Sequence, residues 1–102
     1  KINLVINYQG KSVVYNGQSI DLAPKEFALF TFMAQNKGTA FTRKELMEEV
    51  WGKNHSKEIR TIDEHIKRVR KKLNNTEIEF QPIKTVWGVG YKFSIRKENN
   101  ND

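Results

Sequence analysis

Basic side chains recur along residues 60–74, RTIDEHIKRVRKKLN, at a spacing that suits binding to a polyanion. Lysine and arginine offer long charged donors, and an arginine can donate to both O6 and N7 of one guanine. On an α-helix one face would carry Arg60, Glu64, Lys67, Arg68 and Lys71. A helix with this face fits the major groove of DNA. A solvated surface helix shows the same residue types, so this segment alone leaves both interpretations open.

An apolar stripe on the same segment would anchor such a helix. Ile62, Ile66, Val69 and Leu73 fall at i, i+4, i+7 and i+11, which is one face of an α-helix. The sequence therefore predicts a helix that ends near Asn74, with one face in a core and a mostly basic face outside.

The chain offers little for catalysis or for binding a metal. It has two histidines, His55 and His65, and no cysteine. His65 lies two residues from Asp63, which places the two side chains on different faces of a helix. We therefore expect no catalytic residue, no metal and no cofactor, and an enzyme such as a small nuclease is the disfavoured alternative.

Length and charge limit the remaining classes. A chain of 102 residues, 37% of them hydrophobic, fits one domain with a small core. A net charge of +6 favours nucleic acid, an acidic membrane surface or an acidic protein as the partner. No apolar run approaches the roughly 18 residues of a membrane span, and no signal peptide opens the chain, so we expect a cytoplasmic protein without membrane contact. The first residue, Lys1, suits a domain excised from a longer protein.

Short strands are expected over residues 1–22. Residues 2, 4 and 6 are aliphatic and alternate with others, and residues 12–15 are rich in β-branched side chains. Asn16-Gly17 is a strong signal for a tight hairpin before a third strand at 19–22. Three short strands are barely stable alone, so this antiparallel sheet should pack on a helix.

Two further helices should precede the basic one. Pro24 suits the first turn of a helix over 25–36, which is apolar almost all round and therefore central. Thr42 and Glu45 form a capping box for a second helix over 43–50, ended by Trp51-Gly52. Residues 53–59 are polar and should form an exposed loop.

A β-hairpin should follow the basic helix. Residues 77–93 contain two β-rich runs around Gly88-Val89-Gly90, which we expect to form the turn, and residues 97–102 form a polar tail that we expect to be disordered. The fold class predicted is α+β, a winged helix-turn-helix over residues 1–96. Its parts would be an N-terminal antiparallel sheet (1–22), a three-helix core (23–75) and a C-terminal β-hairpin wing (77–95).

Five motifs lie in order between residues 22 and 93. They are Leu22–Phe27, Phe41–Leu46, Val50–Gly52, Arg60–Leu73 and Ile83–Tyr91. Together they resemble the DNA-binding effector domain of OmpR/PhoB-type bacterial response regulators. The resemblance implies a transcription factor of a two-component phosphorelay, with an N-terminal receiver domain, absent from these residues, that a sensor kinase phosphorylates. It also implies binding to double-stranded DNA as a tandem pair on direct repeats, with the third helix in the major groove and the wing on the minor groove or backbone.

The resemblance also assigns roles to residues. Base contacts would come from Arg68, Glu64, Lys67 and Lys71. Glu64 either accepts from cytosine N4 or is repelled by phosphate. Backbone contacts would come from Arg60, His65, Arg70, Thr42, Arg43 and Trp51, of which His65 is alternatively a surface histidine and Trp51 a core residue. RNA polymerase would be contacted by the loop residues Lys53, Asn54, His55, Ser56 and Lys57.

The wing departs from the family pattern at one position. Thr85 and Tyr91 match contact positions, but Trp87 stands where many members have an arginine. Tryptophan cannot neutralise a phosphate, so it either packs on the sugar–phosphate edge or covers the wing. Lys84 and Lys92 are candidates to supply the lost charge.

A second departure lies before the first helix, where Ala23 replaces a capping Ser or Thr. This should cost about 1 kcal/mol of stability without touching DNA. A protein-interaction module that has lost DNA binding is the remaining alternative.

Overall fold

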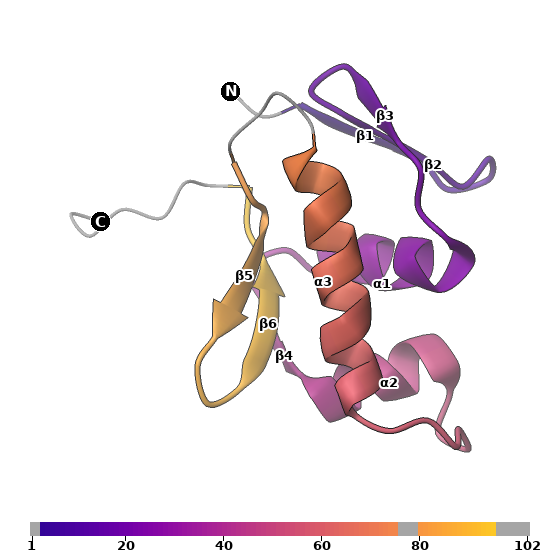
Figure 1. The fold of residues 1–102 in the computed structure, drawn as a ribbon, viewed down its shortest axis with the longest axis vertical. Coiled ribbons are helices and arrows are strands. Elements are labelled where there is room, and N and C mark those ends of the chain that lie inside the picture. The colour runs from indigo at the N-terminus through magenta and orange to yellow at the C-terminus, as the bar shows by residue number, and fades with distance from the viewer. Residues whose placement is uncertain (1–2, 76–79, 96–102) are drawn as a thin grey trace.

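The computed structural model describes residues 3–75 and 80–95. Along them run three strands, a helix, a strand, two helices and two strands (Figure 1). These are β1 (Leu4–Asn7), β2 (Ser12–Tyr15), β3 (Gln18–Ile20), α1 (Pro24–Gln35), β4 (Ala40–Thr42), α2 (Arg43–Trp51), α3 (Arg60–Asn74), β5 (Ile83–Val86) and β6 (Gly90–Phe93). The α+β winged helix-turn-helix expected from the sequence is confirmed.

The N-terminal sheet is antiparallel in the order β1-β2-β3. Asn16 and Gly17 both have positive φ, 48° and 85°, which is the turn geometry that Asn-Gly favours between two strands. The buried side chain of Tyr15 ties this sheet to the segment after α3, because its hydroxyl donates to the Phe80 carbonyl oxygen at 2.6 Å.

Helix α1 lies in the centre of the molecule, as its composition predicts. It contacts α2, α3 and β6, and Leu29, Phe30 and Met33 are fully buried. Ala23 makes no side-chain cap, as expected, but its N–H donates to Glu26 Oε1 at 2.9 Å, so half of a capping box remains.

Helix α3 buries the predicted stripe. Ile62, Ile66, Val69 and Leu73 are each at most 1% exposed and belong to the main core cluster. The predicted capping box of α2 is present: Glu45 N donates to Thr42 Oγ1. The helix reaches Trp51, one residue further than expected.

The strand β4, directly before α2, was not predicted from the sequence. β4 pairs with β6, so the second sheet has the order β4-β6-β5 and the wing is fastened to the start of α2. The expectation that Gly90 belongs to the turn is wrong, because Gly90 starts β6 and pairs with Val86 and Thr42. A Cβ on Gly90 would lie 2.2 Å from the Phe41 carbonyl oxygen, so only glycine fits this close approach of two strands.

The turn of the wing lies one residue earlier than expected and comprises Trp87-Gly88-Val89. Its N–H to carbonyl bond runs from Val89 to Val86 at 2.9 Å, and Gly88 has φ 81°. The start of the predicted hairpin at 77–79 and the predicted tail at 97–102 lie outside the described residues. None of the described helices is long and apolar enough to cross a membrane.

Candidate nucleic-acid interface

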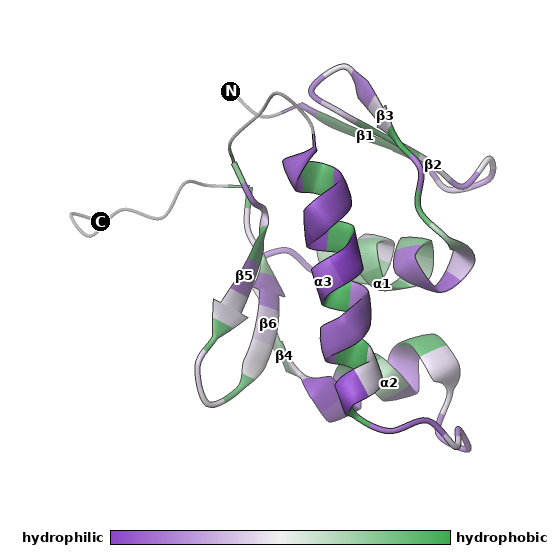
Figure 2. Cartoon of the chain, in the orientation of Figure 1, coloured by the Kyte–Doolittle hydropathy of each residue, from purple (hydrophilic) through white to green (hydrophobic). Residues whose placement is uncertain are grey.

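The outward face of α3 is solvent-exposed along its whole length. Figure 2 shows hydrophilic and hydrophobic residues alternating along this helix, and the hydrophobic ones are buried. All five residues selected from the sequence are exposed: Arg60, Glu64, Lys67, Arg68 and Lys71. Four cations and one carboxylate therefore stand on a rigid, well-anchored helix, as binding to a polyanion requires.

The cation at the start of this face has an ion-pair partner. Arg60 Nη2 lies 3.4 Å from Glu58 Oε1, and both side chains are 74% exposed. Such an exposed pair contributes little and releases its arginine to a stronger anion easily.

Arg70 is already engaged within the protein. Its Nε and Nη2 donate to the Ile83 carbonyl oxygen at 3.2 and 3.0 Å, and Nη2 donates to Thr85 Oγ1 at 2.8 Å. The guanidinium also lies 5.3 Å from the ring centre of Tyr91. Burial lowers the pKa of Arg70, which nevertheless stays protonated at neutral pH. Arg70 thus fastens β5 to α3, and its expected role at a phosphate stays a prediction.

Asp63 joins three elements and was not selected from the sequence. Its Oδ1 accepts from Arg43 Nε at 2.9 Å, at the start of α2, and from the Tyr91 hydroxyl at 2.5 Å, in β6. The Asp63 charge raises the pKa of Arg43. Burial and this hydrogen bond raise the pKa of Tyr91. The Asp63 carboxylate therefore orients Arg43 and Tyr91, which are both predicted DNA contacts. These two residues lie 20 and 28 positions away from Asp63 in the sequence.

His65 and Trp51 pack against each other at one edge of α3. Their ring centres are 4.9 Å apart at 86°, and both residues are half-buried. His65 Nδ1 lies 2.9 Å from the Thr61 carbonyl oxygen, which only accepts, so Nδ1 carries the proton. Lys25 Nζ lies 5.7 Å from the Trp51 ring centre. Both residues thus contribute to packing, and their phosphate contacts remain predictions.

The start of α2 uses part of its hydrogen-bonding capacity internally. Glu45 Oε1 accepts from the Thr42 N–H at 2.8 Å, and Thr42 Oγ1 accepts from the Glu45 N–H at 3.0 Å. Arg43 and Lys44 are exposed at this end. A phosphate here would therefore meet the exposed side chains and the first turn of the helix.

The loop between α2 and α3 is exposed except at one side chain. Lys53, Asn54, Ser56 and Lys57 are exposed, whereas His55 is half-buried. The Nδ1 atom of His55 is enclosed and has no hydrogen-bond partner among the described residues. No group of three metal-ligating side chains occurs in the described ranges either.

The predicted wing residues differ in accessibility. Thr85 is exposed and Trp87 is 90% exposed, while Tyr91 is only 7% exposed. Lys84 Nζ lies 4.7 Å from the ring centre of Phe80. The wing thus exposes the Thr85 hydroxyl and the Trp87 indole to solvent, whereas Tyr91 is buried and supports the wing from inside.

An ion pair between a buried carboxylate and a partly exposed lysine was also not predicted from the sequence. Lys72 Nζ lies 2.6 Å from Glu26 Oε1, and the Glu26 side chain is 6% exposed. Burial raises the pKa of this carboxyl, but hydrogen bonds from Lys72 and the Ala23 N–H, with the Lys72 charge, outweigh it and lower the pKa overall. The two residues lie 46 positions apart in the sequence, so no local sequence pattern predicts the pair.

Comparison with protein families gives a match over most of the chain. The family model described as "Transcriptional regulatory protein, C terminal" matches residues 17–93. The uncharacterized transcriptional regulatory protein YclJ of Bacillus subtilis (strain 168) is 46% identical over 89 residues, which are 86% of this chain and 38% of YclJ. The chain spans about two fifths of the length of the curated relatives it matches first.

Solved structures share the fold. The DNA-binding domain of the response regulator AdeR, in complex with an intercistronic region, superposes with a TM-score of 0.80 at 34% identity. The match covers 90% of this chain and 94% of that one. DrrB, an OmpR/PhoB homologue of Thermotoga maritima, gives a TM-score of 0.76 at 38% identity, with 89% and 41% covered.

Proposed function

The chain belongs to the family of transcriptional regulatory protein C-terminal domains and is the DNA-binding output domain of an OmpR/PhoB-type response regulator, and we propose how it reads double-stranded DNA. In this proposal α3 lies in the major groove and the wing lies on the adjacent minor groove or backbone. Residues 1–96 act as one unit in binding.

The observation that carries the proposal is the two-sidedness of α3. Its inner stripe is fully buried, so the helix is held by the core. Its outer face is exposed and carries four basic side chains without an apolar one. A protein-interaction module would need apolar anchors on such a face, and Trp and Tyr are the usual ones.

Base reading is assigned to the middle of this face. Arg68 is proposed to donate to guanine, with a discrimination of about 1–3 kcal/mol against other bases. Lys67, one residue before it, and Lys71, three residues after it, are proposed to reach base edges or phosphates. Glu64 is proposed to accept from cytosine N4, because a carboxylate facing a phosphate would weaken binding.

Backbone contacts are proposed for the surrounding side chains. They set register and salt dependence without carrying sequence information. The residues are Arg60, His65, Arg70, Thr42, Arg43 and Trp51.

The partners beyond DNA are also proposals. The relatives are more than twice as long as this chain, which leaves room for an N-terminal receiver phosphorylated by a sensor kinase. The exposed loop at Lys53–Lys57 is proposed to contact RNA polymerase, because it projects away from the core between α2 and α3. Two copies are proposed to bind direct repeats in tandem.

The experiment is selection from a random duplex DNA library at about 150 mM salt, where purely electrostatic contacts are weakened. We expect an enriched motif that repeats about once per helical turn, every 10–10.5 base pairs. Retention of DNA without any motif would leave only a basic surface and would refute sequence-specific reading.

A further inference from the structure

Trp87 is the most exposed large hydrophobic residue of the described chain. It is 90% exposed, against 55% for the next, Val5. Its position is fixed, because it follows β5 directly and precedes Gly88, whose positive φ sets the turn. An uncovered indole on a fixed backbone offers a large apolar surface with only two side-chain torsions to order, which suits a contact with a partner.

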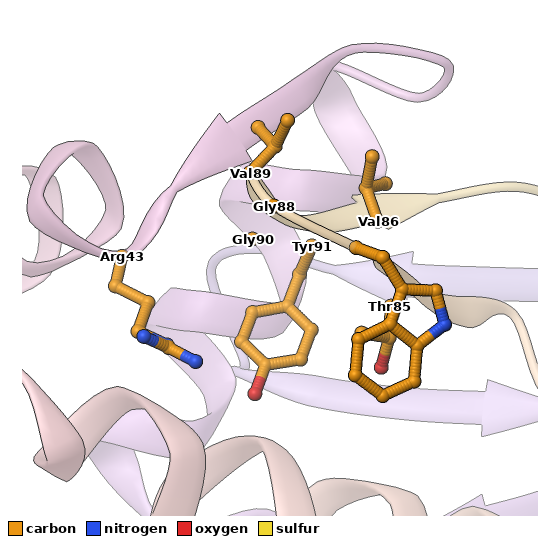
Figure 3. A pocket seen from close by; sticks show the side chains of 8 residues that line it. Arg43, Thr85, Val86, Gly88, Val89, Gly90 and Tyr91 are labelled. Atoms are coloured by element: carbon orange, nitrogen blue, oxygen red, sulfur yellow. The ribbon is translucent and has the colours of Figure 1, made fainter.

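A hollow of about 250 Å³ lies beside this indole. Its lining includes Trp87, Thr85, Tyr91 and, across from the wing, Arg43 of α2. In Figure 3 the side chains of Arg43 and Tyr91 extend to the same side of the wing turn, whereas Val89 points to the opposite side. The hollow therefore combines a cation, a hydroxyl and an aromatic surface.

Hydrogen bonds hold the polar lining in place. Asp63 fixes Arg43 through Nε and fixes Tyr91 through its hydroxyl. Arg70 fixes Thr85. The Arg43 side chain is still 51% exposed, and a guanidinium has five N–H donors, of which this contact uses Nε. The hollow is thus a preorganised site for an anion beside an apolar surface.

The location of the hollow indicates what fills it. The hollow lies between the wing and the start of α2. The hydrogen bond from Arg43 to Asp63 joins this start of α2 to the first turn of α3. With α3 in the major groove and the wing at the neighbouring minor groove, the strand between the two grooves must cross this region. Each unit of that strand has a phosphate and a deoxyribose with an apolar face. The phosphate matches the Arg43 cation and the Thr85 hydroxyl, and the deoxyribose matches the Trp87 indole.

We propose that this hollow seats one sugar–phosphate unit of DNA, with the phosphate on Arg43 and Thr85 and the deoxyribose packed on the Trp87 indole. The proposal rests on the proposed function. It makes Trp87 a sequence-independent contact that is apolar, unlike an arginine inserted in a narrow minor groove. The wing then adds affinity without favouring A-tracts.

The test uses a 30-base-pair duplex of mixed sequence at about 50 mM salt, because a backbone contact needs no operator. Trp87→Ala should weaken binding about tenfold, as expected if roughly 50–60 Å² of apolar ring is covered. The slope of log Kd against log salt should stay unchanged, since no charge is lost. Arg43→Gln should instead lower the slope by about one phosphate contact, and Trp87→Arg should raise it by about one.

Val5→Ala is the matched control, because Val5 is the next most exposed large hydrophobic residue, at 55%, and lies in β1, outside the lining of the hollow. Its affinity should change less than about twofold. Unchanged affinity in Trp87→Ala would overturn the proposal while leaving DNA binding intact. A wild-type chain that binds no duplex at all would instead refute the proposed function.

Fluorescence separates packing on a sugar from insertion between bases. The chain has two tryptophans, so Trp51→Phe leaves Trp87 as the single reporter, and its fold is checked by circular dichroism. A blue shift of Trp87 emission on adding the duplex supports packing on deoxyribose, where the indole leaves water. Strong quenching without a blue shift indicates stacking on bases and overturns the sugar assignment. The affinity of Trp87→Ala in the otherwise unchanged chain decides the matter independently of the Trp51 variant.

Discussion

Replacing Arg70 with alanine should loosen the wing. Hydrogen bonds from a charged donor contribute about 1.5–3 kcal/mol each. Nε and Nη2 share the Ile83 oxygen, so they act as about one such bond, and the bond to Thr85 lies at the exposed edge of the wing. The contact with the Tyr91 ring adds about 0.5 kcal/mol. Allowing for solvent around a half-buried group, we expect a loss of about 2 kcal/mol.

The assay is urea and thermal unfolding of the isolated chain. A loss of this size corresponds to a fall in Tm of about 8–16 °C for a domain of this length. Arg68→Ala is the matched control, since Arg68 is an exposed arginine on the same helix, and its stability should change by less than about 0.5 kcal/mol. Amide chemical shifts of β5 should change in Arg70→Ala and not in the control.

A purely DNA-directed Arg70 would behave differently. The free domain would keep its stability, and only the salt dependence of DNA binding would fall, by about one phosphate contact. Unchanged unfolding of Arg70→Ala would therefore refute the view that this arginine fastens β5 to α3.

Three further substitutions test the packing that supports the interface. Gly90→Ala should destabilise the chain by more than about 2 kcal/mol in urea unfolding. The reason is that the new Cβ would lie 2.2 Å from the Phe41 carbonyl oxygen and force β4 and β6 apart. Unaltered stability would show that the two strands separate easily. Thr42→Ala should cost about 1 kcal/mol and fray the start of α2, with Thr42→Ser as the near-neutral comparison. Glu26→Gln should be less stable than wild type at pH 7, because only the ionised carboxylate pairs with Lys72. This difference should decline as the pH falls below the ordinary carboxyl pKa of 4.5 and vanish below the lowered pKa of the folded state, and a pH-independent difference would contradict the pairing.

Elements with a local signature could be predicted from the sequence. The spacing of Ile62, Ile66, Val69 and Leu73 specifies the buried face of α3, and the exposed face follows from it. Asn16-Gly17 sets a turn through backbone preferences of the two residues themselves. Neighbours within a few residues determine each of these features, so a single sequence contains the information.

Features that depend on distant partners could not be predicted. β4 is three residues long and exists because β6, about 50 residues later, pairs with it. Asp63 resembles any acidic residue in the first turns of a helix, and only the folded chain brings Arg43 and Tyr91 to it. Arg70 is one cation among several in α3, and its inward direction follows from the position of β5.

The candidate site was therefore predictable in part. The outward set on α3 follows from helix geometry, and all of its members are exposed. The division of the other cations between DNA contact and internal support needed the structure, since Arg43 and Arg70 carry internal bonds that their sequence positions do not reveal.

Parallel library selections with wild type and Arg68→Ala test whether the exposed face of α3 reads bases. Both proteins should enrich a motif with the same repeat spacing, and Arg68→Ala should lose preference at one base pair of each repeat, with a cost of about 1–3 kcal/mol for the parent site. Identical motifs from the two proteins, at every position, would show that Arg68 does not read a base.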